Sequence, residues 1–147
     1  MTDFPLAEIT LRKYEPPYNS NKRELVKKIC LSLGLLQPGD SRDVIVDILL
    51  VLLDANKEKK ALNSDEIQEN VISSRKSSSC EEKGIAESNI RRQLKRLRDL
   101  MLVEKSENKY RIAEFEKLSA IFDEKITNFL VPSITSRIKE YLQELEK

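Results

Sequence analysis

Apolar side chains recur every three or four residues in the first third of the chain, the spacing that puts them on one face of an α-helix. This pattern predicts helices over residues 21–35 and 42–57. The second helix carries the mostly apolar run 44–53, which predicts burial on more than one side but is only about half as long as a membrane span. Residues 1–20 show a weak alternating pattern and are predicted to form an arm with at most a short strand.

The next helix has a clear start. Asn63 stands at the N-cap with Glu66 three residues later, the arrangement of a capping box, and Leu62 and Ile67 fill the two positions of a hydrophobic staple. The polar stretch 73–83 then lacks any periodicity. The sequence therefore predicts a helix from Asn63 onward, followed by a loop over 73–83.

A strongly basic helix and a hairpin follow this loop. The buried face of the helix is defined by apolar residues at helical spacing: Ile90, Leu94, Leu97 and Met101. The opposite face carries five basic residues: Arg91, Arg92, Lys95, Arg96 and Arg98. Two short alternating runs, 102–105 and 109–112, flank a turn in which Asn108 can adopt the left-handed conformation. These runs predict a β-hairpin.

The last third of the chain returns to helical spacing, and Pro132 is expected to divide it into two helices, the second capped by Ser133. Both have broad apolar faces. These faces either complete the core of a monomer or form a two-fold dimer interface, and their length and double apolar stripe favour the dimer. The residues assigned to this interface are Phe115, Leu118, Phe122, Ile126, Phe129, Ile134, Ile138 and Leu142.

Composition removes several classes of function. The chain has no His, which excludes Ser-His and Cys-His catalysis, histidine general bases and most zinc sites. Its three Gly cannot form a dinucleotide-binding fingerprint, and Cys30 and Cys80 match no metal or redox spacing. We therefore expect no catalytic residues, no metal and no cofactor. The reduced cysteines and the absence of a signal-peptide pattern or a membrane segment favour a cytoplasmic protein.

The formal net charge is only +1, but the charge is unevenly distributed. Residues 84–111 contain eight basic and four acidic residues, a net charge of +4, whereas the remainder carries −3. The plain interpretation of the basic helix is an ordinary solvated face. The hairpin that follows and the local excess of arginine favour contact with nucleic acid instead.

The stretch from Gly84 to Lys105 resembles the turn, recognition helix and first wing strand of prokaryotic winged helix-turn-helix regulators. Together with its Lys- and Glu-rich composition, the whole chain looks like archaeal proteins of this kind. The matching apolar positions are Ile85, Ile90, Leu94, Leu97, Leu100, Leu102 and Val103. Three features depart from the family: Ala86 replaces the usual Ser or Thr cap, Met101 replaces the helix-ending Gly, and the loop 73–83 is unusually long.

This resemblance implies a mainly α fold with a small β wing. It divides the chain into an N-terminal arm and helix (1–40), a winged helix-turn-helix domain (41–113) and a C-terminal helical dimerisation region (114–147). The implied function is sequence-specific binding of double-stranded DNA by a homodimer acting as a transcriptional regulator.

In that interpretation Asn89, Arg92 and Lys95 meet base edges, and the other basic residues contact phosphates. The full set of expected DNA-binding residues is Ser88, Asn89, Arg91, Arg92, Lys95, Arg96, Arg98, Lys105, Lys109 and Arg111. The main alternative is a winged helix that binds a protein partner within a transcription or replication assembly, because a fold does not fix a function. An enzyme of unrecognised type is a more distant alternative.

Overall fold

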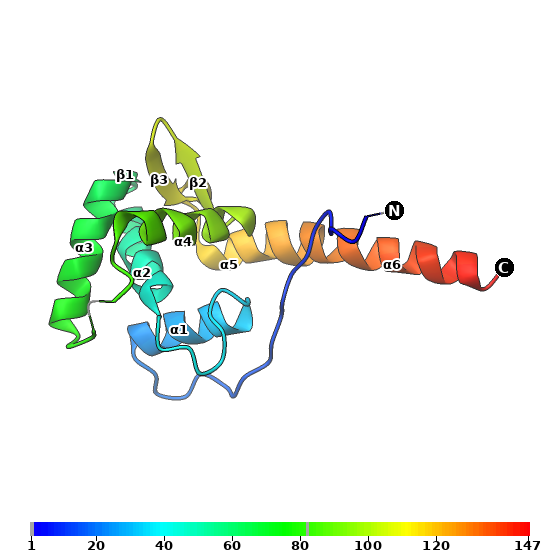
Figure 1. Ribbon diagram of the computed structural model, residues 1–147, viewed down its shortest axis with the longest axis horizontal. Coiled ribbons are helices and arrows are strands. Elements are labelled where there is room, and N and C mark those ends of the chain that lie inside the picture. The colour runs from blue at the N-terminus through cyan, green and yellow to red at the C-terminus, as the bar shows by residue number, and fades with distance from the viewer. Residues whose placement is uncertain (1, 82) are drawn as a thin grey trace.

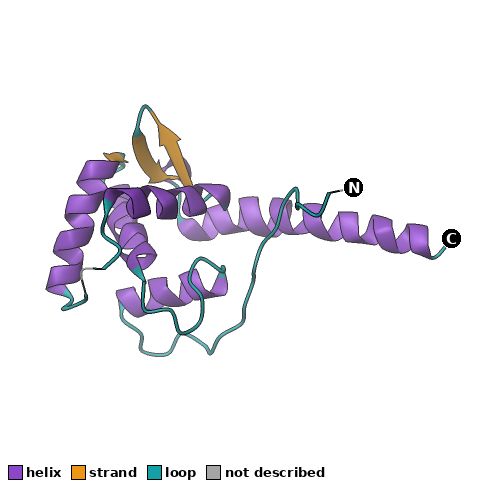
Figure 2. Cartoon of the chain, in the orientation of Figure 1, coloured by secondary structure: helices purple, strands orange, loops and turns teal. Residues whose placement is uncertain are grey.

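The computed structural model describes residues 2–81 and 83–147; Met1 of the arm and Glu82 of the predicted loop lie outside the described residues. The fold is mainly helical with a small three-stranded antiparallel sheet (Figure 2). The elements, in chain order, are α1 (Lys22–Ser32), α2 (Val44–Lys57), β1 (Leu62–Asn63), α3 (Ser64–Ser77), α4 (Glu87–Asp99), β2 (Val103–Ser106), β3 (Lys109–Ile112), the 3-10 turn η1 (Ala113–Phe115), α5 (Leu118–Ile121), the π-helical η2 (Phe122–Leu130) and α6 (Val131–Leu145).

Helix α2 is the centre of the fold. It packs against α1, α3, α4 and β3, so its apolar run is buried on several sides, as the sequence predicted. A single hydrophobic core extends from Val26 in α1 to Ile126 in η2. The predicted segment boundaries near residues 40 and 114 therefore do not separate independent cores.

The sheet has the order β1-β3-β2, with β3 antiparallel to both neighbours. The predicted hairpin is confirmed: Val103 pairs with Ile112, and Glu107 and Asn108 form its two-residue turn with φ of 50° and 64°. Positive φ at both turn positions is the geometry that suits the twist of a tight hairpin. Strand β1 is too short for its pattern to be recognised in the sequence. It leads directly into the Asn63–Glu66 capping box, which is also confirmed.

The polar stretch 73–83 was wrongly predicted to be entirely loop, because α3 continues to Ser77. The residue that holds this last turn is polar: Arg75 is 3% exposed and donates to Asp47 (2.6 Å) and Asp43 (3.1 Å). Burial tends to lower the pKa of Arg75, but the two carboxylates outweigh it and raise the pKa. Apolar periodicity cannot detect a turn that is buried through an arginine.

The C-terminal third is one continuous helical rod rather than two helices separated at Pro132 (Figure 1). Residues at both internal junctions, such as Phe122 and Val131, keep right-handed helical φ and ψ. The departure from α-helical hydrogen bonding occurs in η2, immediately before Pro132, where π-type bonding replaces it. Ser133 therefore does not cap a new helix, and its Oγ donates to the Leu130 carbonyl instead.

The arm contains no strand within its described residues, but it is fixed to the end of α1. The Arg12 backbone N–H donates to the Ser32 carbonyl (2.8 Å), and its guanidinium donates to the Leu31 carbonyl (2.8 Å). Thr10 packs onto Gly34, where an added Cβ would lie only 2.6 Å from the threonine Cβ. Gly34 also has φ of 71°, so this position needs glycine for both its conformation and its close contact.

Candidate nucleic-acid interface

Helix α4 is anchored by its apolar face, since Ile90, Leu94 and Leu97 are fully buried. Ala86 is the N-cap and makes no side-chain capping bond, so the cap expected of the resembled family is absent and Ser88 does not supply it. At the other end Met101 adopts φ of 64°. The Leu102 N–H then bonds the Leu97 carbonyl (3.1 Å) and the Met101 N–H bonds the Arg98 carbonyl (2.8 Å). This Schellman motif supplies the left-handed cap without glycine.

The outward face of α4 is exposed and basic. Ser88, Arg91, Arg92, Lys95 and Arg98 are all exposed there. Arg91 pairs with Glu87 and Lys95 pairs with Asp99, one helical turn away in each case. Within residues 2–81 and 83–147, Arg92 and Arg98 make no ion pair. These two guanidinium groups are therefore available to an anionic ligand.

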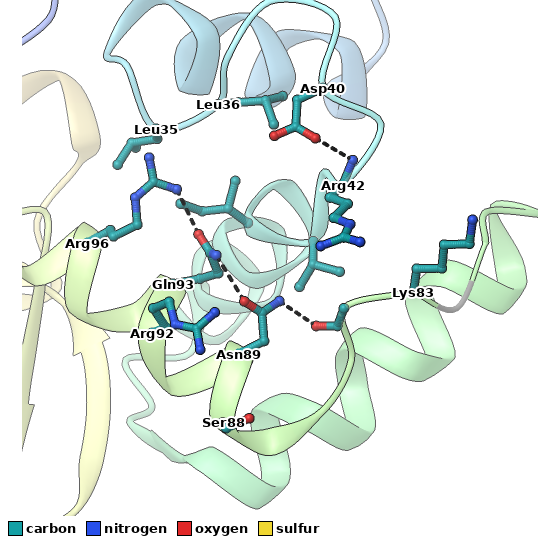
Figure 3. Close-up of a pocket in the computed structure, with 13 residues that line it drawn as sticks. Leu35, Leu36, Asp40, Arg42, Lys83, Ser88, Asn89, Arg92, Gln93 and Arg96 are labelled. Carbon is teal, nitrogen blue, oxygen red and sulfur yellow. Dashed lines mark hydrogen bonds between the residues drawn. The ribbon is translucent and has the colours of Figure 1, made fainter.

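Two residues expected to contact DNA are instead engaged within the fold. The Asn89 side chain donates to the Gly84 carbonyl (2.7 Å) and accepts from Gln93 (3.2 Å). Arg96 donates to Gln93 (2.8 Å) and to the Gly34 carbonyl (3.1 Å). This chain of hydrogen bonds, visible in part in Figure 3, ties α4 to the turn before it and to the loop after α1. Asn89 and Arg96 therefore position the helix.

Gly84 allows the tight turn that leads into α4. It has φ of 76°, and an added Cβ would lie 3.1 Å from the Asn89 amide nitrogen and 3.3 Å from a Val44 methyl. A larger residue would have to move both neighbours as well as accept an unfavourable backbone conformation. The turn between α3 and α4 is thus held against α2 by close packing.

A cleft of about 560 Å³ runs between the N-terminal half of α4 and the loop that connects α1 to α2 (Figure 3). Four basic side chains from three segments line it, together with one acidic residue: Arg42, Lys83, Arg92, Arg96 and Asp40. No sequence pattern indicated Arg42 and Lys83, because they lie outside the basic helix and become its neighbours only through folding. The basic surface of α4 therefore continues into this cleft.

The hairpin contributes cations at its edge. Lys109 is exposed at the start of β3, and Lys105 lies 5.5 Å from the centre of the Tyr110 ring. Arg111 is more constrained: it pairs with Glu104 (2.9 Å) and lies 4.8 Å from the centre of the Phe115 ring. Lys105 and Lys109 are therefore the accessible basic residues of the hairpin, and Arg111 stabilises its base.

The predicted dimer residues divide into three groups. Ile126 is fully buried in the core of its own chain, so its assignment to an interface was wrong. Phe115, Leu118 and Ile134 are half-buried. The exposed members are Phe122, Phe129, Ile138 and Leu142. An apolar surface remains exposed on the outer part of the C-terminal rod, where Tyr141 and Leu145 extend it.

Other kinds of site find little support in the described part of the chain. No group of three or more His, Cys, Asp or Glu side chains there is arranged to hold a metal ion. No helix among those residues combines the length and apolar character needed to cross a membrane. Comparison of the chain with protein-family models, with curated proteins and with solved structures finds no match. The basic surface of α4, the cleft and the hairpin is therefore the candidate site on geometric and electrostatic grounds.

Proposed function

We propose that residues 41–113 form a winged helix-turn-helix domain that binds double-stranded DNA, and that the protein acts as a homodimeric transcriptional regulator. The element order α2-β1-α3-α4-β2-β3, with β1 paired to β3, supports this fold. In such domains the helix before the hairpin enters the major groove. The observation that carries the proposal is the outward face of α4, where Arg92 and Arg98 are exposed and the basic cleft adjoins them.

The accessible residues take two roles in this proposal. Ser88, Arg92 and Lys95 project from the first three turns of α4 and read base edges, a task for which the arginine fork suits guanine. Phosphate contacts come from four further cations whose charges lie around that helix: Arg42, Arg98, Lys105 and Lys109. Arg91 and Lys95 can exchange their exposed intrahelical partners for DNA at little cost, because such surface pairs contribute under about 1 kcal/mol.

The test is fluorescence anisotropy with duplex fragments across a range of salt concentrations. Each phosphate contact removed should lower the slope of log affinity against log salt by about 1, so Arg42→Ala with Arg98→Ala should lower it by about 2. Lys27→Ala is the matched control, because Lys27 is an exposed cation on α1, outside the proposed surface. It should leave the slope unchanged.

Asn89→Ala separates positioning from contact. It removes the hydrogen bonds to Gly84 and Gln93 without removing a charge, so affinity should fall while the salt slope stays constant. The DNA proposal fails if the native protein shows no salt-dependent duplex binding, or if the double arginine variant binds as the native protein does. Either result, together with a co-purifying partner, would favour the protein-interaction alternative.

A further inference from the structure

Helix α6 is unusually exposed for an amphipathic helix. None of its fifteen residues is buried, and it projects beyond the rest of the molecule (Figure 1). Large apolar side chains stand open to solvent on it: Ile138 is 52% exposed, Tyr141 63% and Leu145 80%. An isolated helix of this length is only marginally stable in water, and most helical stability in proteins comes from packing an apolar face. We therefore expect the exposed apolar face of α6 to pack against a binding partner.

The spacing of that face indicates that another helix can pack against it. Five apolar residues of α6 are separated alternately by three and four positions, with Leu142 beside them: Val131, Ile134, Ile138, Tyr141 and Leu145. This is the seam of a coiled coil, in which such residues occupy the a and d positions of a heptad. In that register Arg137 and Glu144 both fall at g, beside the seam.

We propose that α6 pairs with α6 of a second copy of this chain in an antiparallel arrangement, about a two-fold axis between residues 139 and 140. The proposal deepens the homodimer part of the proposed function and does not depend on DNA binding. Antiparallel pairing brings Ile138 opposite Tyr141 of the second copy, and Ile134 opposite its Leu145. It also brings Arg137 beside Glu144 of the second copy, on both sides of the axis.

Charge complementarity selects the antiparallel orientation. In a parallel pair, g positions meet e positions, so Arg137 would lie beside Leu142 and find no carboxylate. Within the single chain Arg137 pairs with Glu140, and Glu144 pairs with Lys147. These side chains are at least 60% exposed, so their pairs are weak and can be exchanged at little cost.

The N-terminal arm borders the same surface without covering it. Phe4 and Leu6 are 85% and 94% exposed. A hollow of about 410 Å³ lies between these arm residues and Ile134, Ile138 and Tyr141 of α6. The arm therefore leaves the seam open, and the helix of a second copy can enter beside it. Burial of Phe4 and Leu6 of the arm against the incoming helix would add to the stability of the pair.

The orientation can be measured with one spin label per chain. Asn128 is exposed and lies about 11 residues from the proposed axis, so nitroxides on Asn128→Cys should be about 35 Å apart along the helix pair, at 1.5 Å per residue. The full-length chain would carry Cys80→Ser to remove the other accessible thiol. A parallel pair would bring the two labels within roughly 20 Å, two helix diameters, and would overturn the proposal.

Sedimentation equilibrium of variants tests the interface itself. Ile138→Asp buries a charge twice at the seam and should weaken dimerisation by about 100-fold or more. Arg137→Glu and Glu144→Arg should each weaken it, and the two together should restore it. Lys139→Glu, one residue from the seam on the outward side, is the matched control and should have little effect.

The dimer proposal fails if the native chain is a monomer at micromolar concentration, if Ile138→Asp remains a dimer, or if the charge reversals do not rescue each other. A dimer that binds no duplex would overturn only the DNA proposal. A monomer that binds duplex with the expected salt slope would overturn only the pairing.

Discussion

Substitution of Asp47 should be among the most destabilising single changes in this protein. Asp47 is completely buried and accepts hydrogen bonds from Arg23 and Ser74 as well as from Arg75. The first of these bonds raises the pKa of Arg23. These side chains join α1, α2 and α3 at one point. The two arginines carry two positive charges, and Asp43 supplies the second carboxylate, 3.1 Å from Arg75 and 3.5 Å from Arg23.

Asp47→Asn keeps the shape of the side chain but leaves two arginines facing one carboxylate. Removing one partner of a buried ion pair typically costs about 3–5 kcal/mol, and the remaining Asp43 argues for the lower end, about 3 kcal/mol. A chain of this length has a total stability of roughly 7–20 kcal/mol. Urea unfolding followed by circular dichroism should show a midpoint lowered by about 1–2 M with an unchanged slope.

A double variant tests the reasoning behind this magnitude. Asp47→Leu combined with Arg75→Met removes one charge of each sign and leaves Arg23 and Asp43 to pair with each other. Its stability should exceed that of Asp47→Asn, because the charge balance is restored. Asp54→Asn is the control: the exposed Lys22–Asp54 pair should contribute less than about 1 kcal/mol. If the double variant is no more stable than Asp47→Asn, uncompensated charge is not the cause.

Three smaller changes are predicted as well. Met101→Gly should raise the free energy of unfolding by about 1 kcal/mol, because it relieves the backbone strain of a non-glycine residue at φ 64° while keeping the Schellman motif. A lower urea midpoint would contradict this. Asn63→Ala should cost about 1 kcal/mol by removing the capping box, whereas Asn63→Asp should cost much less in the same assay. Burial raises the pKa of the Cys30 thiol from 9.0 to about 12, so the unfolded chain ionises first and stability should fall as pH rises through this interval. Cys30→Ala should lack that contribution, of up to about 1.4 kcal/mol per pH unit; parallel pH profiles of the two proteins would refute it.

The sequence predicted those elements whose signals are local. The Asn63–Glu66 capping box and the Glu107–Asn108 turn each depend on residues within a few positions of one another, and both formed as expected. The last turn of α3 was missed because Arg75 is buried through carboxylates on α2, a contact that no periodicity reveals. Pro132 was wrongly expected to end a helix, because the π-helical segment before it lets the rod continue.

The candidate site likewise has a part that local sequence patterns predict and a part that depends on long-range contacts. The outward face of α4 follows from helical spacing alone, and Arg92, Lys95 and Arg98 lie there as predicted. The sequence could not identify Arg42 as a neighbour, because it comes from another part of the chain. Nor could it reveal that Arg96 is held by the loop after α1, since that bond spans 62 positions.

These internal bonds change what the charge of this region means for binding. Residues 84–111 carry eight cations, but Arg91, Lys95, Arg96 and Arg111 already bond to groups within the chain. Within the described residues, some cations of this surface make neither an ion pair nor a side-chain hydrogen bond: Arg42, Arg92, Arg98, Lys105 and Lys109. The salt slope counts phosphate contacts at about 0.9 each, and all of these cations except Arg92 are assigned to phosphates. We therefore expect a slope of about 3–4 per protomer, whereas all eight cations of residues 84–111 would give about 7. A slope near 7 would mean that the intrahelical pairs open on binding, and a slope below about 2 would mean that most of this surface does not touch DNA.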